Sequence, residues 1–325
     1  MGGSLNEAER PGQSPVTADQ ARPVTLSVVI DGRLDVARAR QVAVLTDRLG
    51  LAGVWLRYPW WPLRGTATSE TGTAVLLPVL LSVLASGVQV PLGLLVDAGP
   101  AEHGGADEAG LDRLVQAAGS QADGLPAVPR IALAGSQPAI TRWRELIAHR
   151  AALATARLAL PARAETGPAA AVFVPCAPGR DLPAELAAAA SAAAGRPVLA
   201  EVTVSVGRTA AEARARADAD ELFTLAGHPA AQGLFGTLEE CQAGAARLAQ
   251  AGATELVCYL PLAADLPDVL AQLRSIAIGA GVLRPGEPPS AAPPPPAGWG
   301  GRRRNVQNDA GLVQDSEIAF RADST

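Results

Sequence analysis

The fold of this sequence is constrained most by the alternation of two patterns between about residues 26 and 282. Short runs of Val, Leu and Ala, typical of buried strands, are mostly followed by longer stretches whose apolar residues recur every three or four positions, as on one face of a helix. Strands that alternate with helices in this way predict right-handed crossovers and a parallel sheet.

This pattern predicts about eight strands. Their sequences are TLSVVI, AGVWLR, VQVPLGLLV, RIALAG, ATARLALP, AAVFVPC, PVLAEVTVSVG and TELVCYLP. Eight parallel strands favour a closed barrel over an open sheet, and a barrel of this kind takes about 250 residues. We therefore predict an α/β fold, a (βα)8 TIM-type barrel in complete or degenerate form, over residues 25–283.

Local signals set where some of the helices begin and end. Gly50 should stop the helix that begins near residue 35, because glycine favours the left-handed conformation found after helix C-termini. Thr209 and Thr237 are each followed three positions later by a glutamate, Glu212 and Glu240, which is the capping-box pattern. These signals locate helices and say nothing about function.

The two ends of the chain differ in composition from the predicted barrel. Residues 1–24 are rich in Gly, Ser, Pro and charged residues, and are predicted to form a disordered leader. Residues 284–325 contain Pro-rich and Gly-rich stretches and an arginine triplet. They are predicted to be a disordered tail that serves as a linker or binds a protein partner.

Composition excludes several kinds of function. The formal net charge of −5 gives no basic field for nucleic acid, so no nucleic-acid partner is expected. All 27 basic residues are arginines, which excludes chemistry that needs a lysine, such as a Schiff base. Cys176, Cys241 and Cys258 lack the spacing of a zinc site or disulfide framework, so free thiols, no metal and a reducing compartment are expected. The absence of a signal-peptide core or long apolar run predicts a cytoplasmic protein that does not bind membranes.

Several segments, in their order and spacing, resemble one known family. The segments are TLSVVIDGRLDVARARQVAVLTDRLGLAGVWLRYPWWP, VQVPLGLLVDAGPAEH, VPRIALAGSQPAI, RPVLAEVTVSVGRTAAEARARA and GTLEECQAGAARLAQAGATELVCYLP. Together the main segments cover roughly half of the chain, and they resemble the bacterial luciferase-like oxidoreductases that depend on flavin or deazaflavin. The resemblance implies a barrel that holds FMN or coenzyme F420 at the C-terminal ends of its strands. It also implies monooxygenation or hydride transfer on a small substrate that the sequence does not identify.

The sequence also departs from the family, as a shortened and divergent member would. The family's strand with a GRxxLGxG pattern is missing before VPRIALAGS. Arg57, Tyr58 and Pro59 stand where the family has an acidic residue and a histidine after the second strand. These departures keep a second hypothesis open, in which the chain is a non-catalytic barrel paralogue that binds a ligand or partner.

Four residues are candidates for binding the cofactor. Gly135 and Ser136 lie between a strand and a helix, where backbone N–H groups can hold a phosphate, or where an ordinary turn has the same residues. Leu92 and Gly93 match the family's Leu-Gly pair near the cofactor. Gly93 would let the flavin ring approach the backbone, or it marks a β-bulge.

His103 is the candidate catalytic residue, since it follows the third strand at the expected barrel mouth and histidine titrates near neutrality. His149 is expected on a solvated helix surface, and His228 lies in a loop that contains Gly and Pro.

An aromatic cluster after the second strand is the candidate site for a substrate or partner. It comprises Trp55, Tyr58, Trp60 and Trp61, with Arg57 placed to pair with an anionic group. The alternative is that two of these aromatic residues pack as core and that the arginine is solvated. The expected partners are a small-molecule substrate and, as one option, a second copy of the chain in a homodimer.

The tails give the first testable prediction. Deleting residues 1–24 and 286–325 should leave the melting temperature nearly unchanged, because segments of this composition bury little apolar surface. A thermal melt that falls by more than about 5 °C, which is roughly 2 kcal/mol for a domain of this size, would show that a tail packs on the barrel.

Overall fold

The computed structural model describes residues 24–31, 34–58, 78–83, 86, 88–97, 130–149, 157–161, 170–176, 180–220, 233–261 and 266–279. Of Tyr58, Asp97 and Arg157 it describes the backbone only. All of these residues belong to one compact unit, Met1–Ala292, and Pro293–Thr325 lies outside the described residues. The predicted leader and tail also lie outside them, apart from Val24, so the division into domains stays a prediction.

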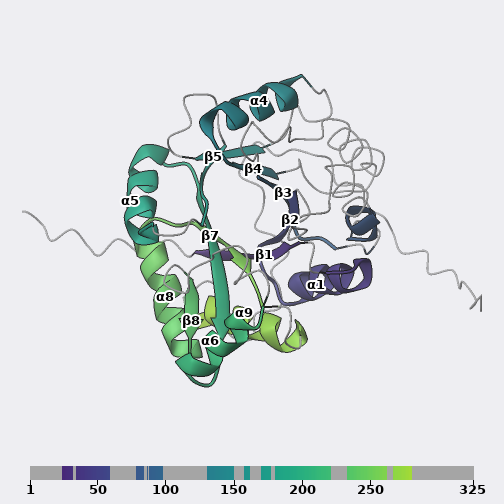
Figure 1. Ribbon diagram of the computed structural model, residues 1–325, viewed down its shortest axis with the longest axis vertical. Helices are drawn as coiled ribbons and strands as arrows, with labels where there is room; N and C mark the ends of the chain where they lie inside the picture. The colour runs from purple at the N-terminus through teal and green to yellow at the C-terminus, as the bar shows by residue number, and fades with distance from the viewer. Residues whose placement is uncertain are drawn as a thin grey trace, which may run out of the picture. The chain divides into compact units, whose positions relative to one another are not determined.

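Eight parallel strands close into a barrel. The strands among the described residues are β1 (Thr25–Ile30), β2 (Gly53–Tyr58), β3 (Leu92–Asp97), β4 (Arg130–Ala134), β5 (Arg157–Pro161), β6 (Ala171–Val174), β7 (Val198–Val206), β8 (Leu234–Gly236) and β9 (Glu255–Tyr259). Strands β1 to β7 pair in chain order, β7 also pairs with β9, and β9 pairs with β1. The ring therefore closes, and the predicted TIM-type barrel is confirmed (Figure 1).

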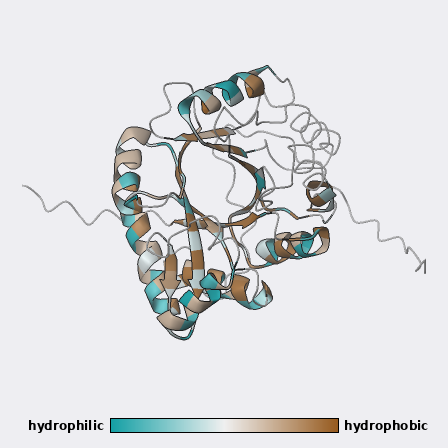
Figure 2. Cartoon of the chain, in the orientation of Figure 1, coloured by the Kyte–Doolittle hydropathy of each residue, from teal (hydrophilic) through white to brown (hydrophobic). Residues whose placement is uncertain are grey.

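Helices cover the outside of this ring (Figure 1). They are α1 (Val36–Arg48), α4 (Gln137–Ala148), α5 (Leu182–Ala193), α6 (Ala210–Asp218), α8 (Leu238–Gln250) and α9 (Leu266–Gly279), and residues 78–83 are also helical. Figure 2 shows strands that are largely hydrophobic and helices that carry both colours, as expected for a parallel sheet buried under amphipathic helices. None of the described helices is both long and apolar enough to cross a membrane.

Two strands differ from the sequence prediction. Strand β3 begins at Leu92 rather than near residue 88, because Pro91 has no N–H to give to a ladder. Strand β8 was not predicted, since three residues are too few to show a period. It lies outside the ring of eight and pairs with the C-terminal end of β7, where Val204 is opposite Leu234.

The predicted helix ends are present. Gly50, with φ 69°, follows the last turn of α1 in the left-handed conformation. Helix α8 has the complete capping box of Thr237 and Glu240. At α6 the Thr209 side chain accepts from the Glu212 N–H as expected, but the Glu212 carboxylate accepts from the N–H of Arg208.

Successive side chains of each strand point to opposite faces, and this divides the core into two layers. Outward residues such as Val202 and Val204 pack under the helices in the larger apolar cluster. Inward residues form a smaller cluster that includes Val29, Trp55, Leu95, Ala132, Ala159, Ala171, Phe173, Leu199, Val257 and Tyr259. Alanines on β4, β5 and β6 leave room for the large rings, so side chains fill the barrel.

Gly93 is needed because the indole of Trp55 lies against it. The two residues are paired on β2 and β3, and a Cβ at position 93 would lie 2.6 Å from Cζ3 of the indole. The pairing of β3 continues without interruption on both sides, so the described strand has no β-bulge at Gly93.

Replacing Gly93 by alanine should therefore destabilise the protein by about 1–3 kcal/mol, because the added methyl overlaps a ring that cannot easily move. Denaturant unfolding measures this loss. The combination of Gly93→Ala with Trp55→Leu should cost less than the sum of the two single changes, since leucine removes the ring from the contact. Strictly additive losses would contradict this explanation of the glycine.

Candidate functional site

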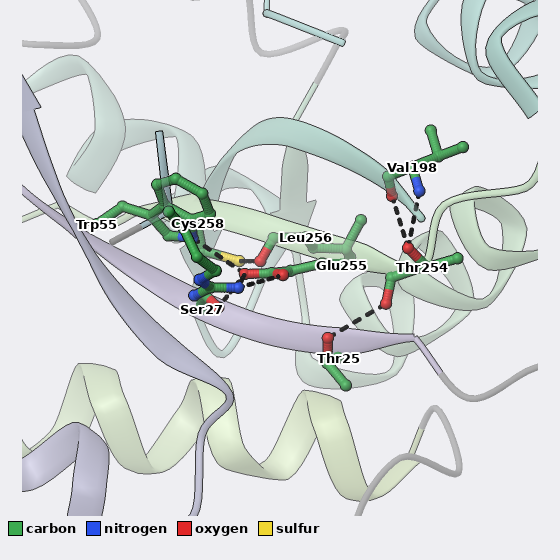
Figure 3. Close-up of polar contacts among 9 residues, drawn as sticks. Thr25, Ser27, Trp55, Val198, Thr254, Glu255, Leu256 and Cys258 are labelled. Carbon is green, nitrogen blue, oxygen red and sulfur yellow. Dashed lines mark hydrogen bonds and ion pairs between the residues drawn. The ribbon is translucent and has the colours of Figure 1, made fainter. Parts of the chain in front are cut away.

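A buried polar cluster closes the end of the barrel where the strands begin. It centres on Glu255, the first residue of β9. The Ser27 hydroxyl donates to Oε1 of Glu255 at 2.5 Å, and the Trp55 indole N–H donates to the same oxygen at 3.0 Å (Figure 3). Arg130 Nη1 lies 2.8 Å from Oε2. The Arg130 guanidinium also lies over the Trp55 ring, 4.5 Å from its centroid. In barrels of this type the N-terminal end of the strands serves stability, so we assign this cluster a structural role.

A second polar cluster lies nearer the C-terminal ends of the strands, where barrel enzymes have their active sites. Arg57 on β2 donates from Nη1 to Oε1 of Glu201 on β7 at 3.1 Å, and also to the hydroxyl of Tyr259 at the end of β9. The backbone N–H of Cys176, just beyond β6, donates to the other Glu201 oxygen at 2.9 Å. Three strands and the segment just beyond β6 thus contribute to what we call the mouth cluster: Arg57, Cys176, Glu201 and Tyr259.

The mouth cluster is largely shielded from water. The side chains of Arg57 and Glu201 are 13% and 5% exposed, and Tyr259 is fully buried. Burial raises the pKa of Tyr259 well above its usual value; Arg57 opposes the shift, and Glu201 adds to it by its charge and by accepting the phenol's hydrogen bond. The phenol therefore keeps its proton at neutral pH.

Cys176 is a thiol rather than a thiolate for the same physical reason. Burial, with a further contribution from the Glu201 charge, raises its pKa to about 12. Its reactivity as a nucleophile is correspondingly low at neutral pH. All three cysteines are free, as predicted, and Cys241 and Cys258 are buried. In the part of the chain that the structure describes, no three His, Cys, Asp or Glu side chains gather as they would around a metal ion.

The predicted aromatic site is only partly described. Trp55 is 1% exposed and belongs to the barrel interior, as the packing alternative expected. Arg57 points to Glu201 and Tyr259 rather than being solvated. The Tyr58 side chain, Trp60 and Trp61 lie outside the described residues, and so do His103 and His228.

The predicted phosphate turn has the local geometry that the sequence suggested. Gly135 follows β4 and has φ 135°, and Ser136 is the N-cap of α4 with a side chain that makes no capping hydrogen bond. Both residues are exposed. Backbone donors at a helix N-terminus and a free hydroxyl fit the phosphate that FMN and coenzyme F420 both carry. His149 is exposed at the other end of α4.

The other two predicted cofactor residues fit less well. The face of Gly93 is covered by the Trp55 indole, so a flavin ring reaches this glycine only if the indole moves. Leu92 is half-buried and packs against the outer apolar cluster rather than toward the barrel interior. The described residues therefore fit the phosphate end of the cofactor and not a ring bound at Gly93.

Sequence reasoning missed the partners of Arg57. Glu201 lies in the run VLAEVTVSV, where a polar residue alternates with valine at positions 201, 203 and 205. In a parallel barrel such alternation indicates that one face of the strand is polar and points inward. Tyr259, at the end of the apolar run ELVCY, gave no comparable signal.

The chain is similar to solved structures, while no protein-family model and no curated protein matches it. EDTA monooxygenase (EmoA) from Chelativorans sp. BNC1 matches with a TM-score of 0.51 and 10% identity, over 81% of this chain and 95% of that one. Coenzyme F420-dependent tetrahydromethanopterin reductase from Methanopyrus kandleri matches with a TM-score of 0.50 and 10% identity, over 77% of this chain and 97% of that one. This chain shares the parallel α/β barrel fold of these two proteins. At 10% identity the likeness establishes the fold and leaves cofactor and substrate to other arguments.

The ion pair of the mouth cluster gives a prediction for stability. Arg57→Met or Glu201→Leu alone should cost about 3–5 kcal/mol of unfolding free energy, since each leaves a buried charge without its partner. The double variant should be more stable than either single variant, because both charges are then gone. Urea unfolding of the three variants measures this, and a double variant less stable than both singles would contradict it.

Proposed function

We propose that this chain is a luciferase-like oxidoreductase that binds FMN or coenzyme F420 at the C-terminal mouth of its barrel and acts on a small molecule. The observation that carries the proposal is the closed barrel, which the chain shares with a monooxygenase and with an F420-dependent reductase. Because one fold serves many activities, the residues at the mouth have to support it as well.

The turn between β4 and α4 supports a site for the phosphate. Parallel strands end at the same side of a barrel, so Gly135 and Ser136 lie at the end of the barrel that also holds the mouth cluster. The exposed turn offers N–H groups and the positive end of the α4 dipole to an anion. It belongs to a twelve-residue helix whose Trp143 and Ile140 are buried, which keeps the turn in place.

The mouth cluster supports a positioning role beneath the ligand. The cofactor would supply the redox chemistry, and the protein would supply orientation and electrostatics. Tyr259 keeps its proton and Arg57 is held by Glu201, so these groups form a rigid polar layer. Such a layer fixes the position of whatever binds above it without itself exchanging protons.

The runner-up function is a non-catalytic barrel that binds a ligand or partner. It is favoured by the internal pairing of Arg57, which occupies the place of the family's acidic residue and histidine. It is also favoured by the Trp55 indole that covers Gly93.

Fluorescence titration of the full chain with FMN and with coenzyme F420 tests the proposal. We expect at least one of them to bind in the micromolar range. Ser136→Asp should weaken that binding by at least about tenfold, because a carboxylate then stands where the phosphate would bind. The same change should not unfold α4, since aspartate is also a good N-cap.

Thr209→Asp is the matched control, because it makes the same change at the N-cap of α6 and should leave affinity unchanged. Absence of binding of either coenzyme at about 100 µM would favour the non-catalytic function. Binding that Ser136→Asp does not weaken would place the phosphate elsewhere.

A further inference from the structure

One hydroxyl beside the mouth cluster is buried and unsatisfied among the described residues. Thr203 is fully buried, and within the described part of the chain its Oγ1 has no hydrogen-bond partner. Its two polar neighbours along the same face of β7 are both satisfied: Glu201 by Arg57, and Ser205 by the carbonyl of Ala213 at 2.7 Å. A buried hydroxyl without a partner costs free energy, so such groups are rare unless a ligand or water completes them.

The position of Thr203 on β7 directs its side chain to the barrel interior near the mouth. Leu199 lies four residues earlier on β7, so its side chain is on the same face of the strand, and it belongs to the interior apolar cluster. Thr203 is paired with Tyr259, the last residue of β9. It therefore lies one layer closer to the C-terminal ends of the strands than Glu201 does.

The surroundings of Thr203 combine a close backbone with an aromatic ring. Gly233 approaches so closely that a Cβ there would overlap both the Thr203 hydroxyl and the ring of Phe235. Phe235, on β8, is partly exposed and packs against the interior cluster. A ligand that binds beside Thr203 would contact one hydroxyl and, next to it, the flat apolar ring of Phe235. The Phe235 side chain would have to change its rotamer to make room for this ligand.

We propose that the Thr203 hydroxyl is a specificity-determining contact for the polar edge of a planar heteroaromatic ring bound at the mouth. This inference rests on the proposed function. The ring systems of FMN and coenzyme F420 share a pyrimidinedione edge of two carbonyls flanking an N–H. A threonine hydroxyl both donates and accepts, so it can bond either kind of group on that edge. Phe235 then packs against the ring beside that edge.

The test compares Thr203→Val with the wild-type chain. Valine has nearly the same shape without the hydroxyl, so the variant should bind FMN or F420 about fivefold to tenfold more weakly. Its melting temperature should not fall, because a methyl group replaces an unsatisfied hydroxyl. Lumiflavin, which has the ring without the phosphate, should show the same loss of affinity.

Two controls separate this contact from general effects. Thr203→Ser keeps the hydroxyl and should bind nearly as well as the wild-type chain. Ser205→Ala removes a hydroxyl that is already bonded within the protein, and it should lower the melting temperature without changing affinity.

The outcomes distinguish this inference from the proposed function. Wild-type binding with unchanged affinity in Thr203→Val would overturn the contact alone and leave the proposed function standing. Absence of coenzyme and lumiflavin binding by the wild-type chain would overturn the proposed function and this inference together. A loss seen with both Thr203→Val and Thr203→Ser would mean that packing, rather than the hydroxyl, sets affinity, which also overturns the contact.

Discussion

The carboxylate of Glu255 is the interaction on which the closed barrel depends. It accepts hydrogen bonds from β1, β2 and β4 at once, and the neighbouring Thr254 bonds Val198 at the start of β7 (Figure 3). Strands that are distant in the chain are thereby joined where the ring has to close. Burying a carboxylate and a guanidinium costs desolvation free energy, and the hydrogen bonds around Glu255 offset that cost. Loss of this one side chain would leave Arg130 buried without its partner in the part of the chain that the structure describes.

The mouth cluster repeats this arrangement at the other end of the barrel. Each cluster contains a glutamate, an arginine and an aromatic ring over which the arginine lies. The ring is Trp55 in the cluster around Glu255 and Tyr259 in the mouth cluster. Both aromatic rings belong to the interior apolar cluster, together with Val29, Leu95, Phe173 and Val257. Barrels of this type bind their ligands at the C-terminal ends of the strands, and this is the end that holds the mouth cluster.

The elements of the structure that were predicted from the sequence are those determined by residues close to one another along the chain. The eight strands of the ring follow from local runs of Val, Leu and Ala, and the turn at Gly135 and Ser136 follows from a strand, two turn residues and a helix in succession. Strand β8 escaped prediction because its three residues pair with β7 through tertiary contacts. Arg57 was identified as a site residue, but Glu201, its partner, lies 144 residues away in the chain. Such a pair follows only from knowing that β2 and β7 face one barrel interior.

The residues of the mouth cluster limit the kind of chemistry that the protein itself can perform. A guanidinium does not give up its proton, and the phenol of Tyr259 is kept protonated by burial. Glu201 accepts from Arg57 at one oxygen and from the N–H of Cys176 at the other. Arg57 and Tyr259 can therefore donate hydrogen bonds and hold a geometry. A barrel with such a mouth suits reactions in which a bound cofactor transfers the electrons, and in which the protein selects the ring and fixes its orientation.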